Sequence, residues 1–533
     1  MVETRNTVEL LGLNLRSFII IAIVVGSVTG GNIWLNRDAP ALGFERYSKF
    51  GFSFEYPQGM SIREQGLAWQ GAPSAVSGIV QGDLMNRNPP EIIGVIWLSF
   101  PSAPDLEAVL DETFAQLGEG TEVEEREPLV KSEKDGYEMK HQFFTLIDYG
   151  TRLSSVVGIW YDTEGRRVYM VFYISLPEAM SQQKLHKGFR RTLGSFENSY
   201  VAPQIVELEP YWPTAGWRTA KPEDLGMDAA KLDEMVKDIQ VRGIGVDSVT
   251  VIRDGYMVLD EYFPPFKEGE RHTLYSCTKS VVSTLIGIAL EEGYLEGLDQ
   301  RMLDLFPDRT VKNLDPWKEA ITLRHLLTMT AGFDARDSYL YNWEGLERMH
   351  ASDDPLQYVL DLPMAREPGT RFEYTNGVSH LLSSILTETT DMSALKFAEE
   401  HLFGPLGITD VEWDSDTQGR NWGYSQLYLS PHDMAKIGYL FLNGGQWDGE
   451  QIVSQEWVEN STAKHVDATI MEGYGYHWWV SPNGYYSAVG YKGQFIHVVP
   501  ILKLVVVFTS RSAEDFDAIL SLLEAYIIPA VIQ

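Results

Sequence analysis

The sequence predicts an α+β protein with two folded domains behind a short apolar N-terminal segment. Three observations support this prediction: the length of 533 residues, the mixture of strand-like and helix-like segments, and a proline-containing stretch without clear periodicity between two regions of different character. A chain of this length exceeds one ordinary domain. We expect an N-terminal segment over residues 1–44, a smaller domain over 45–198, a linker over 199–212 and a larger domain over 213–533.

The composition excludes several classes of protein. The formal net charge of −32 at pH 7 repels phosphate groups, so we expect no nucleic-acid partner. A single cysteine, Cys277, rules out an intramolecular disulfide bond. The Cys/His clusters and the HExxH spacing of common zinc sites are absent, as are a P-loop and a GxGxxG fingerprint. We therefore expect neither a metal ion nor a cofactor.

The N-terminal segment carries the membrane prediction. Twenty uncharged residues lie between Arg16 and Arg37, which is about the length that a helix needs to cross a bilayer. Small and polar residues dilute the second half of this stretch, so a cleaved signal peptide is an alternative. A buried helix of a soluble domain is a third possibility. Either of the first two predictions places the rest of the chain outside the cytoplasm, tethered to a membrane or secreted.

The domain over 45–198 is predicted to be an α+β sandwich. Aromatic side chains alternate over residues 50–56, which is the period of a strand, and two apolar segments flank residues 162–165 as in a hairpin. Amphipathic helices are expected over 104–118 and 177–196. The outline of this domain resembles the PsbP/Mog1-type domains. No nucleophile, base or metal-ligand set stands out in it.

The domain over 213–533 begins and ends with strands. A hairpin is predicted across Asp254-Gly255, and three strands and a helix follow residue 480. Helices and long loops fill the interval. Strands at both ends with helices between them predict one antiparallel sheet, closed by the two ends of the domain, with an inserted helical lobe.

A buried helix that begins at Ser276 carries the first catalytic candidates. Ser276 and Lys279 are three residues apart, so they share one face of the helix. The start of a helix offers unpaired N–H groups and the positive end of the helix dipole, and burial lowers the pKa of a lysine. We predict that Ser276 is a nucleophile and Lys279 its general base. The alternative is a lysine that extends its ammonium group to water.

The segment Tyr374-Thr375-Asn376 precedes an apolar helical run and carries the next candidates. We expect Tyr374 to relay a proton from Ser276 to the leaving group, with its pKa lowered by Lys279. We expect the Asn376 amide to hold Lys279 and a substrate carbonyl. The alternatives are a half-buried packing residue for Tyr374 and a helix cap for Asn376.

Two glycines, Gly490 and Gly493, interrupt an apolar strand near the end of the chain. Glycine within a strand indicates that something approaches the backbone closely. An acyl carbonyl that accepts a hydrogen bond from a strand N–H needs such an approach. A bulge or a bend of the strand is the alternative.

These segments together carry a family resemblance. Ser276-Cys277-Thr278-Lys279 matches an SxxK motif and Tyr374-Thr375-Asn376 a YxN motif, and the domain resembles the serine β-lactamase and penicillin-binding superfamily. It is similar to the class C-like esterase and amidase branch, which includes 6-aminohexanoate-dimer hydrolases. The resemblance implies an oxyanion hole from the N–H groups of Ser276 and of a residue near Tyr491. Gly490, Tyr491 and Gly493 are its implied strand residues.

The third motif of that superfamily, Lys-Thr-Gly or His-Thr-Gly, is absent, and Tyr491-Lys492-Gly493 is the nearest match. We therefore expect an exported serine hydrolase that forms an acyl-enzyme on a small ester or amide. One alternative is a D-alanyl peptidase or β-lactamase. Another is a non-catalytic envelope-binding protein that retains the fold. The sequence identifies no protein partner. Cys277 is expected in the core, and His272 and His325 are weak alternatives as bases.

Overall fold

The computed structural model describes residues 44–531 with internal gaps. The gaps fall at residues 50–51, 66–76, 84–90, 101–102, 116–120, 135–136, 149–150, 176–188, 199–210 and 338–341. The predicted membrane or signal segment therefore lies outside the described residues. Within the part of the chain that is described, no helix is both long enough and apolar enough to span a bilayer.

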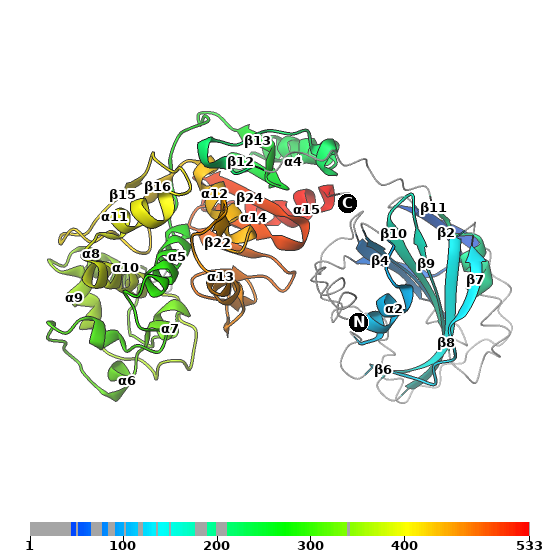
Figure 1. The fold of residues 1–533 in the computed structure, drawn as a ribbon, viewed down its shortest axis with the longest axis horizontal. Helices are drawn as coiled ribbons and strands as arrows, with labels where there is room; N and C mark the ends of the chain where they lie inside the picture. Colours follow the sequence, from blue (N-terminus) through cyan, green and yellow to red (C-terminus); the bar gives the residue numbers. More distant parts are fainter. Residues whose placement is uncertain are drawn as a thin grey trace. The chain divides into compact units, whose positions relative to one another are not determined.

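The described residues group into two units, each of which is presented by itself. One unit contains the chain up to Val206 together with Gly226–Lys231 and Glu524–Gln533, and the other contains Glu207–Leu225 and Leu232–Leu523. The predicted boundaries at 44, 198 and 212 stay a prediction. The predicted α+β class is confirmed, since both units combine a sheet with helices (Figure 1).

Eight of the described strands in the first unit form one antiparallel sheet in the order β3-β4-β5-β10-β9-β8-β6, with β7 paired to β8. These strands are β3 (Ser61–Gln65), β4 (Ser77–Asp83), β5 (Glu91–Ser99), β6 (Thr121–Glu124), β7 (Val130–Lys134), β8 (Tyr137–Asp148), β9 (Thr151–Asp162) and β10 (Arg167–Ser175). A smaller sheet consists of β1 (Phe44–Lys49), β2 (Phe52–Pro57) and β11 (Glu197–Asn198). The hairpin predicted across residues 162–165 is confirmed as β9 and β10.

Both faces of the larger sheet are covered. In β5, Ile92 and Ile96 join a core cluster with helix α2 (Leu106–Ala115), whereas Ile93 and Val95 join a second cluster on the other face with β2. This alternation is the two-residue period of a strand. The expected helix over 104–118 is confirmed as α2. Most of the expected helix over 177–196 lies outside the described residues.

The second unit is built on an antiparallel sheet in the order β13-β12-β24-β23-β22-β21-β20-β19. Its strands are β12 (Val246–Arg253), β13 (Tyr256–Tyr262), β19 (Val466–Asp467), β20 (Gly473–Tyr474), β21 (Trp479–Val480), β22 (Tyr486–Gly490), β23 (Gln494–Val499) and β24 (Leu504–Ser510). Because β12 pairs with β24, the early hairpin and the last strand share one sheet, as the sequence predicts. Short strands β14 (His272–Thr273), β15 (Glu412–Trp413) and β16 (Leu427–Leu429) form another sheet, and β17 (Gln446–Trp447) pairs with β18 (Glu450–Gln451).

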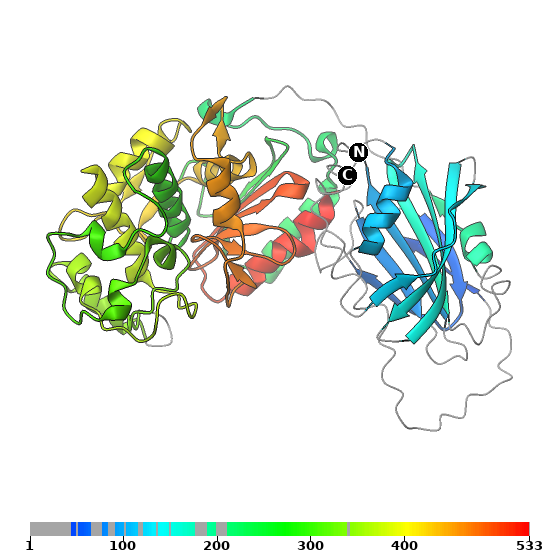
Figure 2. The ribbon, with the colours of Figure 1, turned by 60° about the horizontal axis from the view of Figure 1, so that its bottom comes forward.

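Between β13 and β19 the chain forms the helical lobe, whose helices gather beside the sheet in Figures 1 and 2. Its helices are α5 (Cys277–Glu291), α6 (Pro316–Glu319), α7 (Leu323–Leu327), α8 (Glu344–His350), α9 (Pro355–Leu360), α10 (Asn376–Thr390) and α11 (Ala394–Ala398). Two helices that follow the lobe in the chain are α12 (Pro431–Leu442), which packs on the sheet, and α13 (Gln455–Thr462). Single turns are η2 (Pro213–Ala215), η3 (Pro222–Leu225), η4 (Met302–Leu305), η6 (Glu399–Phe403) and η7 (Pro500–Leu502). The remaining elements are α4 (Ala229–Arg242), α14 (Phe516–Leu522), η8 (Leu523–Ile527) and α15 (Ile528–Ala530).

Helix α5 lies where the sheet and the lobe meet. It contacts β22 and β23 on one side and α10 and α11 on the other. Its side chains are buried along almost the whole length, which explains the near absence of a polar face in its sequence. The first residues of α5 are therefore fixed by two independent layers of structure.

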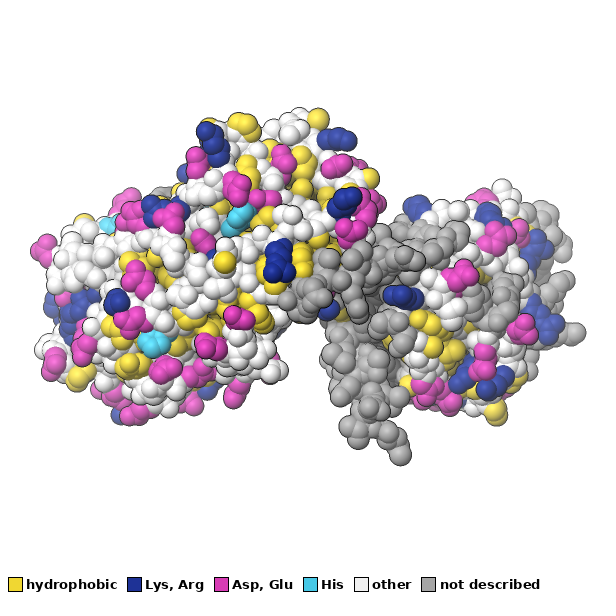
Figure 3. All heavy atoms as spheres, turned by 45° about the horizontal axis from the view of Figure 1, so that its top comes forward, with side chains coloured by type: hydrophobic (Ala, Val, Ile, Leu, Met, Phe, Trp, Pro, Cys, Tyr) yellow, Lys and Arg dark blue, Asp and Glu magenta, His cyan; other side chains and the backbone are white. Residues whose placement is uncertain are grey.

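Helices α12 and α14 pack on β23. A Cβ added to Gly438 of α12 would lie 2.9 Å from the Ile496 side chain, whereas Phe495 contacts Phe516 of α14 with ring centroids 5.2 Å apart. On the face of this unit seen in Figure 3, acidic side chains are dispersed among apolar and neutral ones.

Candidate active site

Ser276 stands at the first turn of α5, as the sequence predicts. It is the N-cap residue, with helical φ and ψ of −72° and −7°, and it is only partly buried. Tyr275 before it has a positive φ of 43°. A non-glycine residue in this region is uncommon and strained. This turn connects β14 to α5 and places Ser276 at the N-terminal end of the helix.

Lys279 points into the protein interior and is 1% exposed. Its Nζ lies 3.2 Å from Ser276 Oγ, 2.8 Å from Asn376 Oδ1 and 3.2 Å from the main-chain oxygen of Tyr424. The predicted proximity of Ser276 and Lys279 is confirmed. The alternative of a lysine that reaches water is wrong for this residue, because its amine is enclosed.

The three contacts of Lys279 can be made by either form of its amine: an ammonium group donates to all three oxygens, and a neutral amine fits them as follows. A neutral amine has two N–H donors and one lone pair. The oxygens of Asn376 and Tyr424 are acceptors only, so both N–H groups are accommodated by them. The lone pair is then left for the third contact, which is the hydroxyl of Ser276.

The burial of Lys279 favours the neutral form of its amine. Burial lowers the pKa of Lys279 from its usual value of 10.5 to about 7, and the nearby carboxylate of Asp337 opposes this effect. Desolvation disfavours a charged amine because protein atoms replace its hydration shell. A substantial fraction of Lys279 is therefore unprotonated near neutral pH.

Tyr374 borders both residues. Its hydroxyl shares a hydrogen bond with Ser276, and Lys279 Nζ lies 4.8 Å from the centre of its ring. Burial raises the pKa of Tyr374, and the hydrogen bond with Ser276 only partly offsets this. The expectation of a lowered pKa for Tyr374 is wrong, because burial raises the pKa and the nearby Asp337 raises it further. Tyr374 is therefore a neutral phenol that can donate a proton.

Aromatic side chains fix the Tyr374 ring. Trp479 lies 5.7 Å from it and Phe372 6.5 Å, measured between ring centres, and Tyr474 contacts all three. The neighbouring Trp478 faces away from this cluster: it is fully buried against Phe441 and belongs to the core.

Asn376 is the first residue of α10, and its amide is not a helix cap. Oδ1 accepts from Lys279, as predicted, while Nδ2 donates to the main-chain oxygen of Asp337 at 3.0 Å. Only one of the two Nδ2 hydrogens therefore remains for a substrate carbonyl. Asp337 was missed by the sequence analysis, because it lies in a loop and no periodicity or motif marks it.

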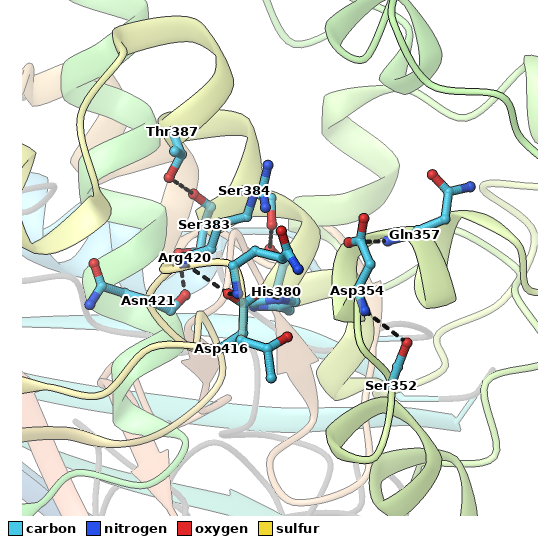
Figure 4. Close-up of polar contacts among 12 residues, drawn as sticks. Ser352, Asp354, Gln357, His380, Ser383, Ser384, Thr387, Asp416, Arg420 and Asn421 are labelled. Atoms are coloured by element: carbon cyan, nitrogen blue, oxygen red, sulfur yellow. Dashed lines mark hydrogen bonds and ion pairs between the residues drawn. The ribbon is translucent and has the colours of Figure 1, made fainter.

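A buried polar network holds the loop that leads to Tyr424 (Figure 4). His380 Nε2 of α10 lies 3.1 Å from Asp416 Oδ2, and Ser383 Oγ donates to the main-chain oxygen of Asn421 at 2.6 Å. These contacts anchor the loop on α10, so α10 positions both the Asn376 amide and the Tyr424 carbonyl. Every residue type has a main-chain carbonyl, so a sequence motif cannot identify the one at Tyr424 that contacts Lys279.

The glycines on the strand side are explained by the protein itself. A Cβ on Gly490 would lie 2.4 Å from the main-chain oxygen of Leu274. Gly493 has a positive φ of 82°, and a Cβ there would lie 2.7 Å from Ile519. The close approach predicted from Gly490 is therefore made by the segment before Ser276 and needs no substrate. The oxyanion role of this strand stays a prediction.

The turn after β22 lies beside the start of α5. Tyr491 is 52% exposed, and its ring contacts that of Tyr275 with centres 5.5 Å apart. Lys492 has a positive φ of 62°, and its Nζ lies 6.0 Å from the ring centre of Tyr275. Lys492 and Tyr491 thus lie beside Tyr275, the residue that precedes the serine.

The remaining candidates, Cys277, His272 and His325, make structural contacts. Cys277 is fully buried and its thiol donates to the main-chain oxygen of Gln494, so the predicted core position is confirmed. His272 faces Asp247 at 3.9 Å, and His325 closes a capping box with Thr322 at the start of α7. Both histidines have local structural partners.

The fold places this protein in the class of β-lactamase and penicillin-binding hydrolases. The family model named Beta-lactamase matches residues 229–525, more than half of the chain, and the protein belongs to this family. The 6-aminohexanoate-dimer hydrolase of Paenarthrobacter ureafaciens is 23% identical over 338 residues, which cover 58% of this chain and 84% of the relative.

Two further relatives extend the comparison. Lovastatin esterase of Penicillium rubens is 24% identical over 188 residues, covering 32% of this chain and 46% of the esterase. The solved structure of an octameric penicillin-binding protein homologue from Pyrococcus abyssi is 23% identical and has a TM-score of 0.48, covering 57% of this chain and 78% of that one. The family match and the 6-aminohexanoate-dimer hydrolase confirm the predicted resemblance to the esterase and amidase branch.

Proposed function

We propose that this protein hydrolyses a small neutral ester or amide through an acyl-enzyme on Ser276. One observation supports this most directly: the amine of Lys279, with a pKa near 7, lies 3.2 Å from the Ser276 hydroxyl and has acceptors for both of its N–H groups. A nucleophilic serine needs an adjacent base, and a base is most effective when its pKa is near the working pH.

The proposed reaction begins with attack by Ser276 Oγ on the substrate carbonyl carbon. The hydroxyl proton moves to Lys279 Nζ, and the main-chain N–H groups of Ser276 and of a residue near Tyr491 stabilise the negative oxygen that forms. Tyr374 donates its proton to the departing alcohol or amine as the bond to the carbonyl carbon breaks. Lys279 then returns a proton to Tyr374, and water releases the acyl group by the same steps in reverse.

Covalent labelling tests the nucleophile. A fluorophosphonate should react with the intact protein, and mass spectrometry should locate the adduct on Ser276. The Ser276→Ala variant should remain unlabelled and retain the thermal unfolding midpoint of the parent protein. Labelling that persists unchanged in Ser276→Ala would remove Ser276 from the mechanism.

The substrate proposal draws on the relatives and on the missing motif. A dimer of 6-aminohexanoate contains an amide and lovastatin esterase takes an ester, so both bond types occur among related proteins. The lysine and threonine of the third motif, which hold a carboxylate in β-lactam recognition, have no match in this sequence. Neutral substrates are therefore favoured over penicillins and cell-wall peptides.

We also propose that the protein is exported and held at a membrane by its first residues. The support is the stretch of twenty uncharged residues between Arg16 and Arg37. Full-length protein should fractionate with membranes, and a chain that begins near residue 40 should be soluble and folded. Recovery of intact, unprocessed protein in the soluble fraction without detergent would contradict both the anchor and the signal peptide.

A further inference from the structure

Asp337 is a buried carboxylate directly behind the candidate catalytic groups. It is 5% exposed, and its Oδ2 accepts hydrogen bonds from the main-chain N–H groups of Asn376 at 2.6 Å and Gly377 at 2.8 Å. These are the first N–H groups of α10, which have no partner within the helix. Asp337 therefore fixes the start of α10 relative to its own loop.

The main chain of Asp337 also decides which way the Asn376 amide faces. Its carbonyl oxygen accepts from Asn376 Nδ2 at 3.0 Å, so the opposite atom, Oδ1, must face Lys279. A flipped amide would set two oxygens against each other and present N–H groups to the amine of Lys279. The orientation that leaves the lone pair of Lys279 toward Ser276 thus depends on Asp337.

The negative charge of Asp337 also raises the pKa of Lys279. The titratable groups that face or influence Lys279 are Asp337, Cys277, Tyr374, Tyr424 and His477. Burial raises the pKa of Asp337 to about 6, so Asp337 is the negative group of this set at neutral pH. The second carboxylate oxygen, Oδ1, has no hydrogen-bond partner among the described residues. Hydrogen bonds therefore stabilise the negative carboxylate through Oδ2 alone.

We propose that Asp337 is a positioning residue for Lys279, which it controls by orienting Asn376 and by balancing the charge of the buried amine. This inference rests on the proposed function for its consequence in catalysis. The contacts themselves do not depend on a substrate. Burial favours the neutral form of Lys279, and the carboxylate of Asp337 favours the ammonium form. The carboxylate thereby prevents burial from making the amine too weak a base to take the serine proton.

The sharpest test is the Asp337→Asn variant, whose amide oxygen still accepts from both main-chain N–H groups. Lysine labelled with ¹³C at Cε reports the titration of Lys279 by NMR, with Lys279→Ala identifying the signal. Since a negative neighbour stabilises the ammonium form, its removal should move the midpoint of Lys279 to lower pH. The ascending limb of kcat/KM for a neutral ester should move in the same direction.

Asp354→Asn is a matched control, because Asp354 also caps a helix of the lobe, accepting from Gln357 N at 3.1 Å (Figure 4). Asparagine is an equally good cap. This variant should leave the titration of Lys279 unchanged. Asp337→Ala, which loses the carboxylate altogether, should lower kcat/KM by about 10²-fold through misplacement of Asn376.

The outcomes separate the inference from the proposed function. An unchanged or raised midpoint in Asp337→Asn would overturn the role of Asp337, even if the ester is hydrolysed normally. A lowered midpoint in a protein that neither hydrolyses esters nor labels at Ser276 would uphold the positioning role and refute the hydrolase. A purely structural carboxylate would reduce activity equally at all pH values.

Discussion

The two sides of Ser276 are built in different ways. Toward α10, Lys279 and Asn376 are almost completely buried and bonded to groups of the protein. Toward the turn after β22, Tyr491 is half exposed and Lys492 has a left-handed backbone. In the proposed mechanism, proton transfer takes place on the buried side, whereas the substrate meets the exposed turn. Changes on the two sides should therefore have separable effects.

The largest effect is expected on the buried side. Lys279→Ala removes the base without weakening the helix, because alanine is the better helix former. Tyr374→Phe removes only the hydroxyl. Each change should lower kcat for ester hydrolysis by about 10²–10⁴-fold, which is the range for general acid–base groups. Stopped-flow measurement of acylation gives the value for each variant.

Lys318→Ala provides the matched control for loss of a buried lysine. Lys318 lies in the same lobe and donates to the main-chain oxygens of Lys312 and Leu360, away from Ser276. It should lower the thermal midpoint and leave acylation of the folded protein intact. Near-full acylation by Lys279→Ala or Tyr374→Phe would show that the altered residue is structural.

The pH profile is the next test of the buried side. The pKa of Lys279 is lowered to about 7, and the base is the unprotonated form. Activity should therefore rise with pH through about 7 and fall roughly tenfold for each pH unit below it. Initial rates with p-nitrophenyl butyrate in buffers of constant ionic strength give this limb. A flat profile between pH 5 and 8 would exclude Lys279 as the base.

Substrate choice probes the exposed side. Loss of a charge-assisted hydrogen bond to a carboxylate costs about 1.5–3 kcal/mol, or roughly one to two powers of ten in kcat/KM. We expect p-nitrophenyl butyrate to exceed nitrocefin in kcat/KM by at least this margin, with Ser276→Ala as the blank. Nitrocefin turnover equal to or above that of the ester would favour a β-lactamase instead.

The smallest effect is expected from Lys492→Ala. Its ammonium borders Tyr275 and Tyr491 and lies outside the network of Lys279. Hydrolysis of a neutral ester should stay nearly unchanged, whereas any activity on an anionic β-lactam should be lost. Equal losses on both substrates would show that the turn supports catalysis itself, and the two sides of Ser276 would then not be separable.

Local patterns were enough to predict much of this fold. The alternation in β2, the turn at Asp254-Gly255 and the apolar run of α5 all identify elements that the structure contains. Each of these depends on neighbouring residues only. The pairing of β12 with β24 also followed, because strands at both ends of a domain have few other ways to cover their edges.

Only those site residues that lie within a sequence motif could be predicted. Lys279 and Asn376 are 97 residues apart, and Lys279 and Tyr424 are 145 apart, so their contacts exist only in the folded chain. The motifs supplied Asn376, but nothing supplied Asp337 or the Tyr424 carbonyl. The pKa of Tyr374 was predicted in the wrong direction because burial cannot be judged from its neighbours in sequence.

The pairing of β12 with β24 has a consequence for synthesis. Val246 pairs with Ser510, so the central sheet cannot close until nearly the whole chain has been made. Closing so long a loop is slow, because its entropy must be lost before the contacts form. The serine, lysine and tyrosine emerge from the ribosome well before the strands that complete their surroundings. We therefore expect Ser276 to be unreactive in a nascent or truncated chain. Reactivity at Ser276 would then indicate that the whole domain has folded.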